Sequence, residues 1–115
     1  MPRLIDLKPR WIDQGDRKGL GIEFGCMIGT HHDGKPCEIR NIALFANPLD
    51  GEPAWAGNSR SLIVLLYGEE ERYNIRGCGD CKWKRTGDTF ESLSCTPSFD
   101  MHQCGHLTLT NGVLG

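Results

Sequence analysis

The sequence predicts a mainly β fold, a small antiparallel sheet of hairpins with little helix. Fifteen of the 115 residues are glycine, near double the usual ~7%, which indicates many turns. Apolar residues alternate with polar residues or glycine in short segments and do not follow a helical period. Because such a turn-rich chain buries limited apolar area, we expect a second stabilising element besides the core. One domain is expected over residues 1–115, a usual length for a single core.

The N-terminal half is expected to contain three strands. Residues 4–7 are short and apolar enough for a strand, and Trp11 with Ile12 forms a small apolar anchor. Residues 19–24 alternate glycine or charge with apolar side chains, as in a half-buried strand. Asp33-Gly34 is a hairpin signal, from which residues 37–45 return as the partner strand.

The middle of the chain is expected to hold a fixed turn and a buried strand. Residues 47–51 predict the turn, since Pro48 pre-sets φ and Gly51 supplies a positive φ. Residues 62–66 are five consecutive apolar residues, whose length and β-branched content favour a strand over a buried helix. The acidic residues 69–71 predict a solvated turn.

The C-terminal half is expected to form hairpins. Residues 82–85 and 89–94 predict two strands around Gly87-Asp88, and residues 106–110 alternate cleanly into Asn111-Gly112, the strongest short hairpin signal. One core should result, formed by Trp83, Phe90, Ile22, Phe24 and residues 62–66.

The charge balance excludes some classes of partner. Thirteen Lys and Arg against fifteen Asp and Glu give a net charge of −2, so bulk attraction to a polyanion is excluded. No apolar run approaches the ~20 residues of a membrane span. The first residues carry charge instead of an apolar signal core. We therefore expect a cytoplasmic protein with no membrane partner.

Six cysteines are the most informative feature of the composition: Cys26, Cys37, Cys78, Cys81, Cys95 and Cys104. In a reducing cytosol, clustered cysteines are more often metal ligands than disulfides. Disulfides and unligated thiols remain alternatives. A redox role for Cys78 and Cys81 would call for a βαβ setting, which the sequence does not indicate.

Spacing selects a first set of zinc ligands. Cys78-Gly79-Asp80-Cys81 is a tight Cys-x-x-Cys turn, which delivers two thiolates to one tetrahedral centre. Cys104-Gly105-His106 adds a third thiolate and an imidazole. The set Cys78, Cys81, Cys104 and His106 would close one structural zinc site, whereas Cys95 lies in a strand-like run and is interpreted as a small buried hydrophobe.

Several fragments also occur together in a fixed order: Pro9-Arg10-Trp11-Ile12, Gly19-Leu20-Gly21-Ile22-Glu23-Phe24 followed by Cys26, Asn47-Pro48-Leu49-Asp50-Gly51, Trp83 before Arg85-Thr86-Gly87-Asp88-Thr89-Phe90, Thr96-Pro97-Ser98 and Thr110-Asn111-Gly112. Over nearly the whole chain they resemble a small phage and bacterial family of unknown function, numbered 6527 in the uncharacterised-domain series. Relatives are sometimes labelled ammonia monooxygenase. We reject that label, because such copper enzymes are membrane proteins and this chain has no predicted span.

The resemblance implies a second version of the zinc site. Members carry a Cys-x-x-Cys after the first strand and a His-x-His, or a Cys with a nearby His, before the final hairpin. Cys26 occupies the first position, but Gly29 stands at the second. This version would use Cys26 with Cys37 or His32, together with Cys104 and His106, and both versions stay open.

A closed zinc site favours a small protein-binding module, because four protein ligands leave no position for a reacting water. The phage setting of the relatives implies action on a host system, such as a defence complex. A nucleic-acid-binding module is the alternative, with basic and aromatic residues that could track phosphate and stack a base: Arg72, Arg76, Lys82, Trp83, Lys84 and Arg85. A zinc-dependent hydrolase with Glu91 or Asp100 as base is a second alternative.

Overall fold

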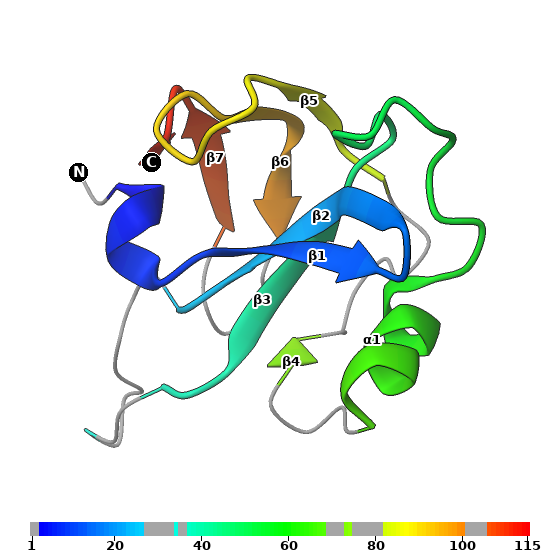
Figure 1. The fold of residues 1–115 in the computed structure, drawn as a ribbon. Coiled ribbons are helices and arrows are strands. Elements are labelled where there is room, and N and C mark those ends of the chain that lie inside the picture. The colour runs from blue at the N-terminus through cyan, green and yellow to red at the C-terminus, as the bar shows by residue number, and fades with distance from the viewer. Residues whose placement is uncertain (1–2, 27–33, 35–36, 69–72, 75–81, 101–105) are drawn as a thin grey trace.

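A computed structural model of the protein describes residues 3–26, 34, 37–68, 73–74, 82–100 and 106–115. In chain order its elements are η1 (Leu4–Leu7), β1 (Arg10–Gln14), β2 (Arg17–Phe24), β3 (Arg40–Leu44), α1 (Ser59–Tyr67), β4 (Tyr73–Asn74), β5 (Lys84–Thr86), β6 (Ser94–Asp100), β7 (His106–Thr110) and β8 (Val113–Leu114). They form two four-stranded sheets, in the orders β1-β2-β3-β4 and β5-β6-β7-β8 (Figure 1). The pairings are antiparallel except for β3 with β4. The prediction of a mainly β fold is confirmed, although with two sheets in place of one.

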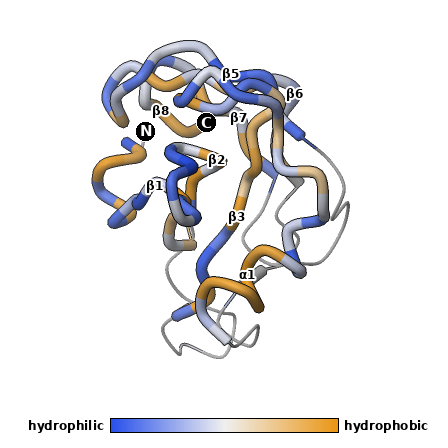
Figure 2. Tube along the Cα trace, turned by 45° about the vertical axis from the view of Figure 1, so that its right-hand side comes forward, coloured by the Kyte–Doolittle hydropathy of each residue, from blue (hydrophilic) through white to orange (hydrophobic). Residues whose placement is uncertain are grey.

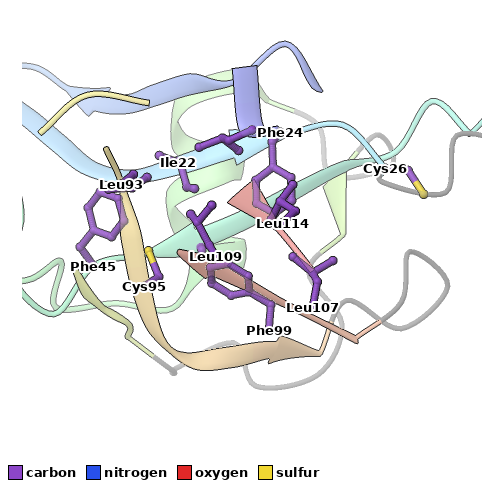
Figure 3. Close-up of a cluster of buried hydrophobic side chains, with 12 residues drawn as sticks. Ile22, Phe24, Cys26, Phe45, Leu93, Cys95, Phe99, Leu107, Leu109 and Leu114 are labelled. Atoms are coloured by element: carbon purple, nitrogen blue, oxygen red, sulfur yellow. The ribbon is translucent and has the colours of Figure 1, made fainter. Parts of the chain in front are cut away.

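The two sheets pack on each other through one group of side chains, the inter-sheet cluster. From the first sheet, Ile22 on β2 lies opposite Ala43 on β3, so both point to the same side. From the second sheet, Leu107 and Leu109 alternate with exposed neighbours along β7. Figure 3 shows Ile22, Leu107 and Leu109 meeting between the sheets. The full cluster is Leu4, Ile22, Phe24, Cys26, Ala43, Phe45, Leu93, Cys95, Phe99, Leu107, Leu109 and Leu114, and Trp83 and Phe90 pack against it as predicted.

The apolar run at residues 62–66 is helical, so the prediction of a strand there was wrong. The Asn58 side chain caps the helix by accepting a hydrogen bond from Ser61 N at 2.8 Å, and Gly68 ends it with a φ of 71°. Both are ordinary helix boundary signals. A run of apolar residues has no period, and these two caps at its ends indicate the helix.

Helix α1 covers the other face of the first sheet, where a second cluster forms. Alternation along β3 sends Ile42 and Leu44 to this face, opposite to Ala43 and Phe45. This helix-side cluster consists of Ile12, Leu20, Ile42, Leu44, Leu62 and Ile63. The expectation of one core containing both Ile22 and residues 62–66 was therefore wrong. The first sheet therefore has a buried cluster on each face, and Figure 1 shows α1 on one side of it and the second sheet on the other.

Two of the predicted turns are present. Gly51 has a φ of 75°, and the Asn47 side chain pairs with the backbone of Arg85, accepting from its N at 2.8 Å and donating to its O at 2.9 Å. Asn111 and Gly112, with φ of 47° and 76°, connect β7 to β8 as a hairpin.

Four other local predictions need correction or lie outside the described residues. Residues 4–7 form a 3-10 helix and not a strand. Residues 89–93 form a turn that precedes β6, so the strand starts later than predicted. Most of the turn around Asp33-Gly34 and all of residues 69–71 lie outside the described residues.

Candidate functional site

Three of the four residues in the first zinc set, Cys78, Cys81 and Cys104, lie outside the described residues. His106 starts β7 with an exposed side chain, and its Nε2 lies 2.8 Å from Ser98 Oγ. The Ser98 carbonyl accepts a hydrogen bond from Trp83 Nε1 at 3.4 Å. Ser98 therefore contacts both His106, two residues after Cys104, and Trp83, two residues after Cys81.

The described members of the second zinc set lie on different sides of the second sheet. Cys26 is 7% exposed and belongs to the inter-sheet cluster, and Figure 3 shows it at the edge of that cluster. Leu107 points into the same cluster, so alternation along the strand directs His106 to the outer face. Cys37 packs against the cluster beside Cys26, and His32 lies outside the described residues. Within the described ranges, no three His, Cys, Asp or Glu side chains gather as a metal site.

Cys95 behaves as a structural residue. Its side chain is 4% exposed within the inter-sheet cluster. Burial raises the pKa of its thiol to about 12, so the reactive thiolate is absent at neutral pH. The interpretation of Cys95 as a small buried hydrophobe is confirmed.

The described residues of the basic and aromatic segment are mostly occupied by contacts within the fold. Trp83 packs edge-on against Phe99, with ring centroids 5.2 Å apart. Arg85 donates to the Asn47 carbonyl at 2.9 Å and to the Gly87 carbonyl at 2.6 Å. Lys82 Nζ donates to the Gly57 carbonyl at 3.1 Å. Lys84 is exposed, and Arg72 and Arg76 lie outside the described residues.

The two candidate bases of a hydrolase are not gathered around a described metal ligand set. Glu91 is exposed in the turn before β6. The backbone of Asp100 lies opposite His106 in the β6–β7 register.

The structure reveals a buried carboxylate, Glu23, that joins three strands and the helix. Glu23 is fully buried on β2. Its Oε1 accepts hydrogen bonds from Arg10 Nη2 at 2.6 Å and from Arg40 Nε at 3.2 Å. Its Oε2 accepts a hydrogen bond of 2.8 Å from the hydroxyl of Tyr67, which lies at the end of α1. A buried charge is tolerated only when it is paired and hydrogen-bonded in this way.

The protonation states within this group follow from its geometry. Burial, and then the hydrogen bond to Glu23, raise the pKa of Tyr67 to about 12. Tyr67 therefore stays a neutral donor over the physiological range. The hydrogen bond from Arg10 to Glu23 raises the pKa of Arg10 above its ordinary value. The Tyr67 ring also stacks on Tyr73 with centroids 5.2 Å apart.

Three hollows adjoin this group and share Arg40. One of about 340 Å³ is bordered by Cys26, Cys37 and Arg40 among others. The second, of about 400 Å³, is lined by Lys8, Pro9, Arg10 and Arg40. The third, of about 300 Å³, is lined by Arg10, Glu38, Arg40 and Tyr73. We call these three together the Arg40 groove.

Sequence reasoning missed the residues of this site. Glu23 stands in an alternating strand, a pattern that predicts a solvent-facing carboxylate. Its partners Arg10, Arg40 and Tyr67 are 13, 17 and 44 residues away. The one local hint is that Glu23 has apolar neighbours on both sides, in a strand that proves buried on both faces.

Comparisons with protein families, curated proteins and solved structures find no match for this chain. None of the described helices has the length and apolar character to cross a membrane.

Proposed function

We propose that this chain is a small protein-binding module whose fold is stabilised by one structural zinc ion. The observation that carries the binding role is the outer side of α1. Leu65 is 60% exposed and Val64 46% exposed, whereas Leu62 and Ile63 on the inner side are fully buried. Figure 2 shows the helix as hydrophobic over most of its length.

Adjacent large apolar side chains on a helix surface are typical of docking faces. A partner that covers Val64 and Leu65 would remove the rest of both side chains from water. Because each is about half exposed, this contributes roughly 1–1.5 kcal/mol per side chain, about half of the value for burying a fully exposed one. The resemblance to a phage and bacterial family supports a partner in a host system, such as a defence complex.

The zinc proposal uses Cys78, Cys81, Cys104 and His106. Its support is the pair of contacts at Ser98, which bring Trp83 and His106 to one residue of β6. The opposite placement of His106 and the Cys26 side of the second sheet favours this set over the one containing Cys26. Thiolates and neutral imidazole match the preferences of zinc, and metal binding would add to folding free energy.

Affinity capture from a host lysate, read by mass spectrometry, tests the binding role. We expect Leu65→Lys to abolish capture of the specific partner without lowering the melting temperature, because Leu65 is exposed. Val113→Lys is the matched control, since Val113 is also exposed, at 36%, but lies on β8. Equal capture by the wild type and both variants would overturn the helix-face proposal. Capture of nucleic acid that is lost in Lys84→Gln would support the nucleic-acid alternative instead.

Elemental analysis of the purified protein tests the zinc role. We expect one zinc per chain in the wild type and in Cys95→Ser, and loss of zinc in Cys78→Ser and Cys104→Ser. Zinc-free wild-type protein, or full retention in both of the last two variants, contradicts the proposal. Loss in Cys26→Ser alone would identify the second ligand set as the correct one.

A further inference from the structure

We propose that Ser98 is a positioning residue for the zinc site, which holds His106 so that Nδ1 of the ring, and not Nε2, binds the metal. This inference rests on the proposed zinc role. The Ser98 hydroxyl oxygen lies 2.8 Å from His106 Nε2, which is hydrogen-bond distance. Because this contact occupies Nε2, Nδ1 is the ring nitrogen left for a metal.

The chemistry of a zinc-bound histidine requires a partner of this kind. Histidine binds zinc as a neutral imidazole, with one ring nitrogen on the metal and the proton on the other. With Nδ1 on the metal, Nε2 carries the proton and donates it to the Ser98 hydroxyl oxygen. Metal-binding histidines generally donate their second N–H in this way, and the acceptor fixes the orientation of the ring. Nδ1 is also the nitrogen closer to the backbone, which suits a metal shared with Cys104, two residues away.

The strand pairing explains why a serine reaches this ring. Asp100 pairs with His106 in the β6–β7 register, so Ser98, two residues before Asp100, is a diagonal neighbour of His106. Diagonal neighbours in a sheet lie within reach of a long side chain such as histidine. Phe99 points into the inter-sheet cluster, so alternation places Ser98 on the outer face together with His106.

Two features of the fold hold Ser98 in place before a metal binds. Its carbonyl accepts the hydrogen bond from Trp83 Nε1 at 3.4 Å, and the same indole packs edge-on against Phe99. The β6–β7 register also shifts between Cys95 and Phe99, just before which Ser98 lies. Such irregularities re-aim side chains and are common beside functional sites. Groups that are ordered in advance lose less entropy on binding.

Zinc affinity, measured by competition with a chelator, gives the first test. We expect Ser98→Ala to bind zinc about 10- to 100-fold more weakly than the wild type, the usual effect of removing the partner of a metal-binding histidine. Ser98→Thr keeps the hydroxyl and should restore binding. Thr108→Ala is the matched control, because it removes a hydroxyl from an exposed residue of β7, and it should bind like the wild type.

NMR of the wild type, with a spin-active cadmium isotope in place of zinc, identifies the coordinating nitrogen directly. We expect through-bond coupling between cadmium and His106 Nδ1, with the imidazole proton on Nε2. The signals of His106 are assigned by their loss in His106→Gln. A role of Ser98 in stability alone would not select between the two ring nitrogens, and this measurement needs no variant of Ser98 to fold.

The outcomes separate the positioning role from the zinc role. Coupling of cadmium to His106 Nε2, equal zinc affinity of Ser98→Ala and Thr108→Ala, or a loss in Ser98→Ala that Ser98→Thr does not restore each overturns the positioning role and leaves the zinc role standing. Zinc-free wild-type protein in the elemental analysis overturns both. Coupling to Nδ1, together with weakened binding in Ser98→Ala and its restoration in Ser98→Thr, supports the proposal.

Discussion

At the scale of single residues, Glu23 connects three strands and the helix, although its place in an alternating strand predicts a solvent-facing side chain. One carboxylate receives donors from β1, from β3 and from the last residue of α1. Tyr67 is the residue that brings the helix to this contact. The helix has only nine residues, too few to be stable alone in water. Its attachment through Leu62, Ile63 and Tyr67 therefore sets its position on the sheet.

We predict that Glu23→Gln lowers the free energy of unfolding by roughly 3 kcal/mol, the lower end for breaking a buried ion pair. The amide leaves Arg40 without its charge partner, with a side chain only 18% exposed, whereas Arg10 can turn to water. Urea denaturation measures the loss. Glu38→Gln is the control, because Glu38 is exposed and a surface change of this kind stays within about 0.5 kcal/mol. Equal stability of the two variants would contradict the prediction.

The Tyr67 phenol predicts a loss of stability in alkali. Its pKa is about 12 in the folded protein and about 10 in an unfolded chain. The neutral phenol is therefore favoured by folding, and its contribution is full below about pH 10 and disappears as the pH rises through 12. Wild type and Tyr67→Phe should differ in unfolding free energy at pH 8, and this difference should shrink above pH 10. A constant difference across this range would show that Tyr67 does not donate to Glu23.

At the scale of elements, two glycines with the same backbone angle give a matched test of turn geometry. Gly51 and Gly112 have φ of 75° and 76°. A Cβ at Gly51 would meet no atom within 4 Å, whereas one at Gly112 would lie 2.7 Å from the carbonyl oxygens of Phe90 and Glu91. Gly51→Ala should destabilise by about 1 kcal/mol from the left-handed backbone alone. Gly112→Ala should lose the same amount and roughly a further 1–3 kcal/mol of unfolding free energy, because the added Cβ overpacks the turn. Thermal unfolding of the two variants measures the difference between their stabilities.

Elements whose signal is local were predictable from the sequence. The Asn111-Gly112 hairpin follows from turn chemistry carried by two adjacent residues. Helix α1 was mistaken for a strand because residues 62–66 have no polar face to reveal a period. The signals that identify the helix lie outside the run, at Asn58 and Gly68. Its outer side stays exposed, at Leu65 above all, which hydrophobicity alone does not predict.

The candidate site was far less predictable than the fold. The Arg40 groove combines Lys8, Arg10 and Arg40, which are brought together by the pairing of β1 with β2 and of β2 with β3. No spacing rule connects such positions in advance. The cysteine spacing, by contrast, yields a definite zinc hypothesis, and the contacts of Ser98 are the structural observation that bears on it.

At the scale of the whole molecule, Trp83 connects the two sheets. Its backbone N donates to the Leu44 carbonyl and its carbonyl accepts from Ala46 N, both at 2.8 Å, at the end of the first sheet. The next residue, Lys84, begins β5 of the second sheet. The indole meanwhile packs on Phe99 of β6. Both sheets also contribute to the inter-sheet cluster, so neither can keep its apolar face buried without the other.

We therefore predict that the two sheets unfold together and that Trp83→Ala weakens both. The indole is half-buried, so the loss should be roughly 3 kcal/mol, the lower end for removing a large aromatic from a core. The backbone bonds to β3 remain, so the variant should keep its fold at low temperature. Far-ultraviolet circular dichroism and the fluorescence of the remaining tryptophans, Trp11 in the first sheet and Trp55 before α1, should report one coincident transition in urea.

Lys84→Ala, the exposed neighbour of Trp83, should unfold like the wild type. Two separate transitions, or a Trp83→Ala variant as stable as Lys84→Ala, would show that the sheets are independent units and that the indole does not connect them.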